Sequence, residues 1–441
     1  MDRKMARRSF LKCSLAAGVA GVAAPMILPS GVLAANGRPG ANDRIVIGAI
    51  GAGAMGSGII RLLTAYDDIQ VAAVVDVDQT KREYVAGEIN ATPYRDYREM
   101  LDRDDIDAVT IATPEHWHGL LTIHSAQAGK DIYCEKPMSL TISEGRRMVD
   151  AVRKYGRVLQ TGSQDRSNPQ NYEACMLIRN GRIGKIEKVI SADYASPQRN
   201  GMPGHPIPDD IDWDLFCGPV QPHPFHPSFR EVRGWVSYYE FAGHAATSLG
   251  THGFDQIQWV LNTSDTGPVE IWTEGEPFKP SINRAEAGHV PGNQNEPRVF
   301  MRYANGITIE SGDAPWFGAR FIGEHGSITI DRGEYTADPP ELIEEPLENP
   351  EVVVLPKSTN HFRNWVDCIR DRSDPVCHVE IGHRTATVTH LLNIARWVSE
   401  VTGETGNILQ WDPVQELFTN SPWGNHFLDR PRRKPYDYPA I

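Results

Sequence analysis

Several features that mark other classes of protein are missing from this sequence. The chain has 44 lysines and arginines against 57 aspartates and glutamates, a net charge of −13, so no basic excess favours nucleic acid or anionic lipid as a partner. No Gly-x-Ser-x-Gly elbow and no Cys-x-x-Cys pair occurs, which disfavours the usual serine-hydrolase layout and paired-cysteine sites. Beyond residue 35, no stretch reaches the roughly 18 apolar residues that a membrane-spanning helix needs. What remains is the composition of a globular protein of two or three domains.

Residues 1–35 have the composition of a removable export signal. A basic start is followed by a Gly/Ala-rich apolar stretch and then by small residues, the pattern of a secretory signal peptide. The run Arg7-Arg8-Ser9-Phe10-Leu11-Lys12 resembles the twin-arginine type. Because Pro25 and Pro29 interrupt the apolar stretch, we expect export to the periplasm or secretion, with no membrane span after the leader is removed. An uncleaved N-terminal anchor is the alternative.

Cysteine is scarce, and its number is odd once the leader is set aside. Six cysteines occur, and Cys13 lies in the leader, so five remain and cannot all pair within one chain. We expect mostly small buried thiols. A bridge between Cys368 and Cys377 is the alternative that an oxidising compartment would allow.

The first half of the chain alternates short apolar runs with longer amphipathic ones, which predicts an α/β fold with a parallel sheet. We assign residues 36–162 to a dinucleotide-binding (Rossmann) domain. The expected strands are Arg44–Ile50, Val71–Val75, Ala108–Ala112, Ile132–Cys134 and Val158–Gln160. The expected helices lie around Ile59–Ala65, up to Glu83, up to Gln127, and at Ser143–Tyr155.

From residue 163 to residue 441 the pattern changes to that of an α+β domain with an open, mainly antiparallel sheet, used for substrate binding and oligomerisation. Asn305-Gly306 and His325-Gly326 each lie between two apolar runs, as in β-hairpins. The spacing of apolar residues predicts amphipathic helices at Phe362–Asp371 and His383–Val401. Eight prolines lie between Pro197 and Pro227, but aromatic residues accompany them, so we expect an ordered lid or a subunit contact.

A glycine-rich motif follows the first expected strand and opens the first helix. It reads Gly51-Ala52-Gly53-Ala54-Met55-Gly56. Glycines at these places allow a tight turn, the approach of a pyrophosphate and close packing of helix on strand. Asp76 ends the second strand, where a carboxylate binds ribose hydroxyls and repels a 2′-phosphate. This favours NAD over NADP, although Lys81 and Arg82 keep NADP open.

Three further segments, taken with this motif, resemble the Gfo/Idh/MocA family of sugar and cyclitol oxidoreductases. They are Thr113-Pro114-Glu115-His116-Trp117-His118, Glu135-Lys136-Pro137 and Gly250-Thr251-His252-Gly253-Phe254-Asp255. The resemblance implies that Lys136 lies by the nicotinamide and stabilises a developing alkoxide. It also implies that His252 takes the hydroxyl proton.

One position departs from that family, which often has aspartate four residues before the histidine. Here this residue is Ser248, which cannot stabilise an imidazolium as a carboxylate does. Asp255 is the expected substitute, because residues three apart on a helix share a face.

The remaining site residues are assigned by their place along the chain. The expected cofactor contacts are Gly51, Gly53, Ala54, Met55, Asp76, Thr113, Pro114, His118, Glu135, Lys136 and Gln164. The expected substrate contacts are Arg166, Trp213, Trp235, Tyr239 and His244. We expect no metal, because His116-x-His118 and His223-x-x-His226 come without a cysteine or carboxylate cluster.

These features together indicate an oxidoreductase that transfers a hydride from a sugar or cyclitol hydroxyl to a tightly held NAD, because free nicotinamide cofactors are scarce outside the cytoplasm. Two alternatives stay open. One is a redox-neutral NAD-dependent glycosidase or epimerase that oxidises a sugar transiently, and the other is a nucleotide-binding protein without catalysis. The resemblance also implies a homo-oligomer, a dimer or tetramer.

Overall fold

The computed structural model describes residues 39–40, 43–283, 296–344 and 353–441. The chain divides into two compact units, Met1–Arg44 and Ile45–Ile441, and the fold described here is that of the second. In the first unit, the described residues include Arg44, whose Nε donates a hydrogen bond to the Pro39 carbonyl. The expected leader at 1–35 lies outside the described residues. None of the described helices is both long and apolar enough to cross a bilayer.

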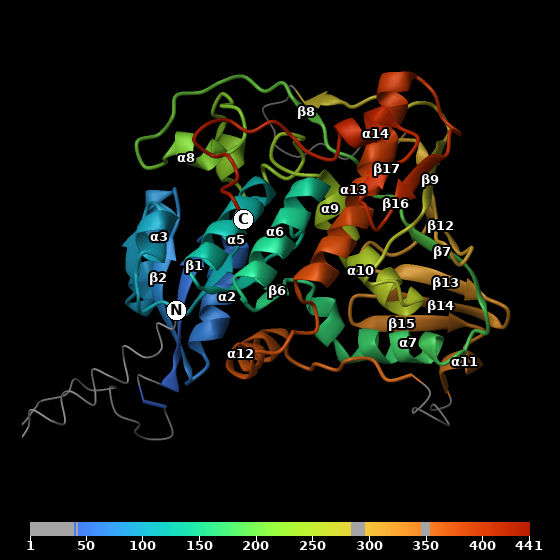
Figure 1. The fold of residues 1–441 in the computed structure, drawn as a ribbon, viewed down its shortest axis with the longest axis horizontal. Helices are drawn as coiled ribbons and strands as arrows, with labels where there is room; N and C mark the ends of the chain where they lie inside the picture. Colours follow the sequence, from blue (N-terminus) through green and yellow to red (C-terminus); the bar gives the residue numbers. More distant parts are fainter. Residues whose placement is uncertain (1–38, 41–42, 284–295, 345–352) are drawn as a thin grey trace, which may run out of the picture. The chain divides into compact units, whose positions relative to one another are not determined.

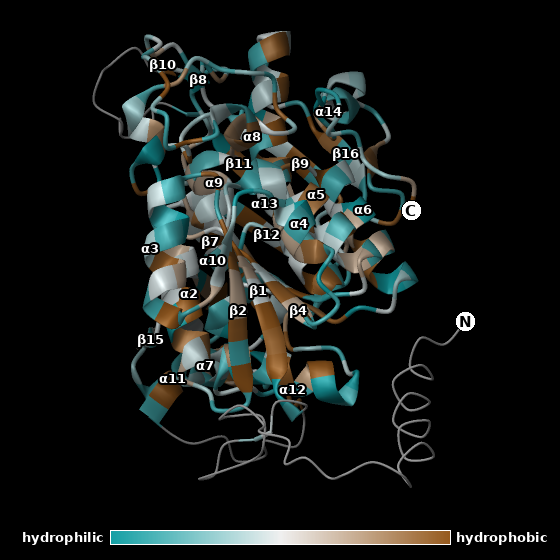
Figure 2. Ribbon diagram, turned by 90° about the vertical axis from the view of Figure 1, so that its left-hand side faces the viewer, coloured by the Kyte–Doolittle hydropathy of each residue, from teal (hydrophilic) through white to brown (hydrophobic). Residues whose placement is uncertain are grey.

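The first half forms a six-stranded parallel sheet in the order β3-β2-β1-β4-β5-β6, which confirms the predicted Rossmann domain. Its strands are β1 (Ile45–Ile50), β2 (Ile69–Val75), β3 (Thr92–Tyr94), β4 (Ala108–Ile111), β5 (Asp131–Cys134) and β6 (Leu159–Thr161). Strand β3 was not anticipated, because its three residues are partly exposed and contain no apolar run. Figure 2 shows β1 and β2 as hydrophobic strands inside the molecule, as burial on both faces requires.

Helices connect these strands and cover the sheet. They are α2 (Ala54–Thr64), α3 (Gln79–Ile89), α4 (Tyr97–Leu101), α5 (Glu115–Gln127) and α6 (Ile142–Lys154). Side-chain caps fix three of their starts: Asp78 accepts a hydrogen bond from the Lys81 N–H, Asp96 from the Arg98 N–H, and Thr141 from the Glu144 N–H. The strand order switches between β1 and β4, from one side of β1 to the other, so the carboxyl ends of these parallel strands form the crevice where α/β sheets bind ligands.

Helix α12 (His361–Asp371) belongs to the second half of the sequence but packs on the Rossmann sheet. Its Phe362 ring stacks on Tyr133 of β5 at 4.7 Å, and Trp365 lies 5.6 Å from the same ring. Figure 1 shows this orange helix next to the blue first elements. The core of the first domain is therefore completed by residues far outside 36–162.

The second half forms a nine-stranded sheet in the order β15-β14-β13-β7-β12-β11-β9-β16-β17. The strands are β7 (Ile186–Ala192), β9 (Glu270–Glu274), β11 (Arg298–Arg302), β12 (Thr308–Gly312), β13 (Ala319–Gly323), β14 (Gly326–Asp331), β15 (Glu334–Asp338), β16 (Leu409–Asp412) and β17 (Leu417–Phe418). Both predicted hairpins form, as β11–β12 and β13–β14. The sheet is mainly antiparallel as expected, but β7 and β12 pair in parallel.

Helices cover one face of this second sheet. They include α7 (Pro169–Arg179), α10 (Gly250–Leu261) and α13 (Val379–Thr402), which share the largest buried apolar cluster with the sheet. The other face carries Trp272 stacked on Phe300 at 5.3 Å and an ion pair between Arg302 and Glu270. The sheet is therefore amphipathic, with one face committed to the core.

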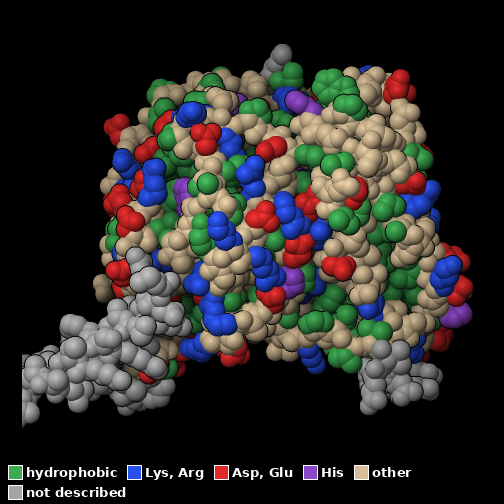
Figure 3. All heavy atoms as spheres, in the orientation of Figure 1, with side chains coloured by type: hydrophobic (Ala, Val, Ile, Leu, Met, Phe, Trp, Pro, Cys, Tyr) green, Lys and Arg blue, Asp and Glu red, His purple; other side chains and the backbone are tan. Residues whose placement is uncertain are grey.

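Helix α13 also joins the two halves by ion pairs. Arg146 of α6 binds Glu380 of α13 and Glu416 at 2.9 and 2.7 Å. Figure 3 shows acidic and basic side chains interspersed over the face that α6 and α13 present in Figure 1.

The proline-rich segment is ordered, as its aromatic residues predicted. We call residues 198–241 the cover; it contains β8 (Arg199–Asn200), α8 (Trp213–Cys217) and η3 (Pro227–Arg230). It has an apolar cluster of its own, formed by buried Met202, Ile211, Trp213, Phe216, Cys217, Phe225, Phe229, Tyr238 and Phe241. This cluster holds the cover in one conformation despite its prolines.

Candidate active site

The glycine motif forms an open turn at the carboxyl end of β1. Gly51 has φ +99°, and a Cβ on it would lie 2.6 Å from the Ala112 carbonyl oxygen, so a side chain is excluded. Nothing lies within 4 Å of the place where a Cβ on Gly53 would stand. Helix α2 begins next to it with no side-chain cap, so its first N–H groups are available to an anion. This arrangement fits the pyrophosphate of a dinucleotide.

Asp76 directly follows β2 and stabilises this turn. Its carboxylate accepts hydrogen bonds from the Ala52 N–H at 2.7 Å and the Asp78 N–H at 2.9 Å. Burial raises the pKa of Asp76, and the two backbone donors oppose this rise. Lys81 donates to the Arg230 carbonyl at 3.2 Å and lies 3.5 Å from Asp78, so it is already engaged. A carboxylate beside an engaged lysine favours the ribose of NAD over the 2′-phosphate of NADP.

The glycine turn and the cover enclose a cleft of about 420 Å³. Residues of the Rossmann domain form one wall, and residues of the cover form the other. The lining includes Gly53, Ala54, Met55, Asp76, Lys81 and Pro114 on the first side and Ile211, Phe216, Phe229, Arg230, Arg233 and Trp235 on the second. The expected cofactor contacts near the turn are therefore brought together.

The cover is fastened to the Rossmann domain at the end of this cleft. Arg230 binds Asp78 at 2.7 Å and Asp210 at 2.8 Å, and Asp78 is 2% exposed. The Gln79 N–H donates to the Asp210 carbonyl at 2.8 Å. On the other side, His116 Nε2 lies 2.8 Å from the Phe216 carbonyl oxygen, and burial lowers the pKa of His116 to about 3. His116 therefore attaches the cover to α5 as a neutral ring.

A smaller pocket of about 110 Å³ follows the cleft and contains the Glu-Lys-Pro motif. Its lining residues are Met55, Thr113, Glu115, His118, Glu135, Lys136, Pro137, Arg233, Trp235, Val236, Ser248 and Leu249. Thr113, His118, Glu135 and Lys136, all expected near the nicotinamide, are among them.

Lys136 is held at the floor of this pocket by backbone rather than by a carboxylate. Its Nζ donates to the Ser248 carbonyl oxygen at 2.9 Å. Burial lowers the pKa of Lys136, Glu135 opposes this most strongly and Glu115 opposes it when ionised, and Arg233 contributes to the lowering. Ser248 therefore contributes its carbonyl oxygen to the site.

His252 has a carboxylate partner, but this partner is Asp165 and the expectation of Asp255 is wrong. His252 Nδ1 lies 2.8 Å from Asp165 Oδ2, and both side chains are almost completely buried. Asp165 comes from η2 (Gln164–Ser167), directly after the last parallel strand. Burial lowers the pKa of His252, which Asp165 opposes, so the ring is neutral near pH 7. Its Nε2 makes no hydrogen bond with any described residue, and His252 is buried and not among the lining residues of the two site pockets.

Asp255 instead belongs to a buried structural pair. It binds Arg166 Nε at 2.7 Å and accepts a hydrogen bond from Thr385 at 2.9 Å. The Arg166 guanidinium also lies 5.1 Å from the Trp259 ring. Arg166 is 3% exposed, its guanidinium is engaged by Asp255 and Ser264, and it lines neither site pocket, so the structure gives it a structural role in place of the expected substrate contact. One turn of helix separates Asp255 from His252, but the two face different partners.

Two of the other expected contacts, Gln164 and His118, hydrogen-bond to segments next to the pocket. Gln164 donates to Glu135 at 2.9 Å and to Tyr133 at 2.8 Å, so it orients Glu135. His118 lies between the carbonyl oxygens of Thr113 and Pro137, at 2.9 and 2.8 Å, and burial lowers its pKa. Each ring nitrogen faces a carbonyl oxygen, and the neutral ring can donate to one of the two, so His118 contacts the ends of both segments.

Of the four aromatic and histidine residues predicted to contact substrate, only Trp235 lines the two site pockets. Trp213 is buried in the cover, with its indole N–H on the His223 carbonyl at 2.7 Å. Tyr239 lies under the guanidinium of Arg430, 3.9 Å from its carbon. His244 is buried at the start of α9 (His244–Ser248), with φ +59°.

Sequence reasoning missed three residues of the site. Glu115 is 1% exposed and accepts hydrogen bonds from the Gly243 N–H and the Thr247 hydroxyl. Burial raises its pKa to about 8, so it is mostly protonated at neutral pH. Arg233, from the cover, lines both pockets. Asp165 had a signal, since it lies between the two residues expected to face the site.

Other candidate chemistry is not present in the described part of the chain. It contains no group of three or more His, Cys, Asp or Glu side chains arranged to hold a metal. Cys368 and Cys377 are free and buried, so the alternative of a bridge is wrong.

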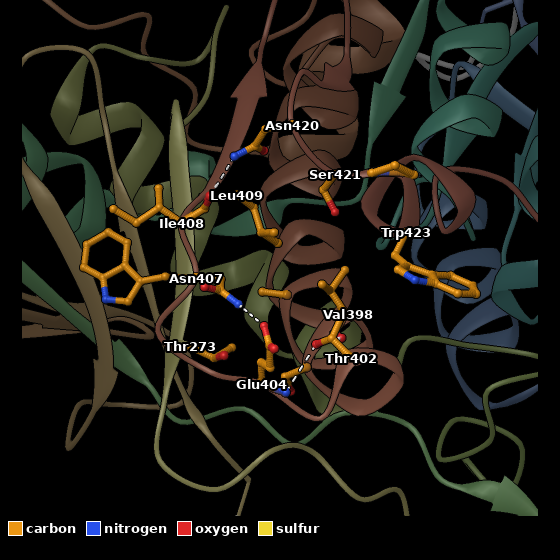
Figure 4. Close-up of a pocket in the computed structure, with 14 residues that line it drawn as sticks. Thr273, Val398, Thr402, Glu404, Asn407, Ile408, Leu409, Asn420, Ser421 and Trp423 are labelled. Atoms are coloured by element: carbon orange, nitrogen blue, oxygen red, sulfur yellow. Dashed lines mark hydrogen bonds between the residues drawn. The ribbon is translucent and has the colours of Figure 1, made fainter.

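A further cavity of about 390 Å³ lies between β9, β16 and the end of α13, and none of its lining residues belongs to the two site pockets. Figure 4 shows that its polar groups already bind one another: Asn407 donates to Glu404 and Asn420 donates to the Ile408 carbonyl. These groups are satisfied within the fold, so the cavity is not part of the candidate site.

Comparison with known families agrees with this geometry. Residues 45–163 match the Gfo/Idh/MocA model described as an oxidoreductase family with an NAD-binding Rossmann fold. Residues 193–438 match the model of the C-terminal alpha/beta domain of the same family. Together the two matches span most of the chain.

Individual relatives are more distant. The uncharacterized oxidoreductase YrbE of Bacillus subtilis is 33% identical over 259 residues, which are 56% of this chain and 61% of that protein. Inositol 2-dehydrogenase 2 of Saccharopolyspora erythraea is 36% identical over 142 residues, 32% of this chain and 42% of that one. The chain thus spans less than two thirds of these relatives. The WlbA dehydrogenase from Bordetella pertussis, solved with NADH and UDP-GlcNAcA, has the same fold, with TM-score 0.58 and 19% identity over 84% of this chain and 99% of that one.

Proposed function

The chain belongs to the Gfo/Idh/MocA oxidoreductase family, and from this premise we propose that it oxidises a hydroxyl of a sugar or cyclitol by hydride transfer to a captive NAD. The observation that carries the proposal is the pocket that joins Lys136 to the dinucleotide cleft beneath the cover. An inositol dehydrogenase among the relatives supports a polyol substrate.

In this proposal each residue of the site has a separate role in the transfer of the proton and the hydride. NAD, when bound, supplies the hydride acceptor. The substrate hydroxyl gives its proton to His252 Nε2, and Asp165 stabilises the imidazolium that forms. The Lys136 ammonium stabilises the negative charge that develops on the substrate oxygen. Glu135, held by Gln164, keeps a carboxylate beside Lys136 and favours its protonated form.

The cover supports a cofactor that stays bound between turnovers. Its ion pair with Asp78 and its contact with His116 fasten it to the Rossmann domain over the cleft, so we expect these contacts to slow the release of a bound dinucleotide. A captive cofactor suits an enzyme exported to the periplasm by the twin-arginine-type leader, where NAD is not replenished. A second substrate must then reoxidise the cofactor in place.

The amphipathic second sheet supports a homo-oligomer. Its outer face carries the partly exposed Trp272, stacked on the buried Phe300, beside the ion pair of Arg302 and Glu270. Pairing of two such faces would bury this aromatic surface. Light scattering should give the mass of a dimer or tetramer, and a monomer would contradict this part of the proposal.

The test is product analysis without added cofactor. The purified chain is incubated with sugars, cyclitols and glycosides, and the products are read by mass spectrometry. Net oxidoreduction gives one product lighter by two hydrogens and an equal amount of a reduced partner. Cleaved glycoside without hydrogen loss would instead indicate redox-neutral chemistry on the same pocket.

Lys136→Met is the inactive variant, and Lys188→Met, which removes an ion pair with Glu310 on the second sheet, is its matched control. Full activity of Lys136→Met would contradict the site, and absence of any product even with added NAD would favour a binding protein.

A further inference from the structure

Arg332 lies one side chain away from the proposed base. It stands in the turn between β14 and β15, and its Nε donates to Asp165 Oδ1 at 3.3 Å. Its guanidinium carbon lies 4.9 Å from the Phe317 ring, and that ring lies 5.5 Å from the imidazole of His252. The guanidinium is therefore fixed beside the Asp165–His252 pair by a hydrogen bond and by an aromatic face.

The outer nitrogens of this guanidinium are unused. The side chain is 46% exposed, and its Nη atoms make no hydrogen bond or ion pair with any described residue. Arg166, the residue that follows Asp165 in the sequence, is instead buried and paired with Asp255. A guanidinium held by its Nε with its outer N–H groups free presents a planar fork that fits a carboxylate.

Arg332 lines neither site pocket, but its positive charge is near enough to Lys136 to lower the pKa of that lysine. Arg233, which also has no ion-pair partner among the described residues, faces the dinucleotide cleft, where the NAD pyrophosphate would neutralise it. Glu115 is mostly protonated at neutral pH, since its pKa is about 8. Asp165 is shared between His252 and Arg332, so it balances only one of the two once His252 takes a proton.

We propose that the substrate carries a carboxylate, and that Arg332 binds it beside the hydroxyl that is oxidised. This rests on the proposed function and narrows its substrate to acidic sugars or cyclitols, such as uronates. The carboxylate would occupy the free N–H fork of Arg332 while the neighbouring hydroxyl faces His252 and Lys136.

The test compares acidic with neutral sugars. D-Glucuronate and D-galacturonate are measured against D-glucose, D-galactose and myo-inositol in the unmodified chain, in Arg332→Gln and in Arg298→Gln. Arg298 is the matched control, since it is 51% exposed and lies on the second sheet beside Glu310. We expect the acids to be preferred, and Arg332→Gln to lower their kcat/KM about ten- to a hundredfold, mainly through KM, because a charge-assisted hydrogen bond is lost. Arg298→Gln should change nothing.

Two results overturn the inference and leave the proposed function standing. One is equal or better use of the neutral sugars by the unmodified chain. The other is an equal loss on acids and neutral sugars in Arg332→Gln, which would make Arg332 a positioning residue for Asp165.

A separate binding measurement covers the case in which no sugar is oxidised, which contradicts the proposed function. Calorimetric binding of D-glucuronate that weakens in Arg332→Gln would then still support a carboxylate site. Absence of such binding would overturn it.

Discussion

His252 Nδ1 lies 2.8 Å from Asp165 Oδ2, and the two residues reach each other from elements 87 positions apart in sequence, α10 and η2. This pair supplies the carboxylate that Ser248 cannot. In the proposed mechanism Nε2 of the ring is the proton acceptor, and Asp165 stabilises the imidazolium that forms.

We predict that Asp165→Asn lowers kcat about a hundredfold or more, because the imidazolium loses its stabilising charge. Asp165 raises the pKa of His252 against the effect of burial, so its loss should move the acid limb of the pH–rate profile to lower pH. Steady-state kinetics between pH 4 and 8 give both quantities.

Asp255→Asn is the contrasting variant. It leaves the buried charge of Arg166 uncompensated, at a cost of about 3–5 kcal/mol in the free energy of unfolding. The acid limb of its pH–rate profile should not move. A shift as large as that of Asp165→Asn would show that Asp255 orients His252.

Lys136 should set the alkaline limb of the same profile. Its pKa lies below the ordinary 10.5 because of burial, so activity should fall as the pH rises through that lowered pKa and the ammonium loses its proton. Lys136→Arg keeps a cation at all accessible pH values. Its activity, although reduced by the larger group, should show no alkaline limb, and an unchanged limb would assign that titration to another residue.

The cover should control release of NAD. Arg230→Ala removes the ion pairs that join the cover to Asp78 and Asp210. We expect bound NAD to dissociate about ten- to a hundredfold faster, as expected for loss of partly buried charged hydrogen bonds. The NAD retained after timed dialysis is the measurement. Arg302→Ala, which breaks an ion pair on the second sheet, is the control and should retain NAD normally.

Glu115 should make the free energy of unfolding depend on pH. Its pKa is about 8 when folded and near 4.5 when unfolded, so the folded chain holds a proton that the unfolded chain releases in this window. Stability should therefore fall as the pH rises from 4.5 to 8, by about 1.4 kcal/mol per pH unit at most for one proton. Glu115→Gln should flatten this dependence, as read from Tm at pH 5.5 and 8.5.

Glu380→Gln is the control for this titration. Ion pairs with Arg146 and Arg384 hold the pKa of Glu380 at about 2, so it is ionised throughout the window. Its loss should lower Tm by the same amount at both pH values. A Glu115→Gln variant that behaved in this way would contradict the raised pKa.

Local signals in the sequence were sufficient to predict the fold of the nucleotide-binding half. The glycine turn, Asp76 and the strands that precede them depend on neighbouring residues, and Gly51 with its positive φ is readable as a turn residue. The Glu-Lys-Pro motif follows directly from the end of β5, and Lys136 lines the smaller pocket next to the cleft.

Contacts between distant segments were not predictable in the same way. Helical spacing favoured Asp255 for His252, but the packing of α10 against η2 and α13 turned Asp255 toward Arg166 and Thr385. Helix α12 returns to the Rossmann sheet through Phe362 and Trp365, which an amphipathic pattern alone cannot assign to one sheet or the other. Arg332 was missed for the same reason, since its role depends on a turn that folds back onto Asp165.

The most direct test of the account measures the dinucleotide that the purified chain holds. After extensive dialysis the protein is denatured, and the released NAD and NADH are quantified before and after incubation with D-glucuronate. The account predicts dinucleotide close to equimolar with the chain, and conversion of NAD to NADH by the sugar in the unmodified protein but not in Lys136→Met. A chain that retains no dinucleotide and forms NADH only when NAD is supplied in solution would contradict the captive cofactor beneath the cover.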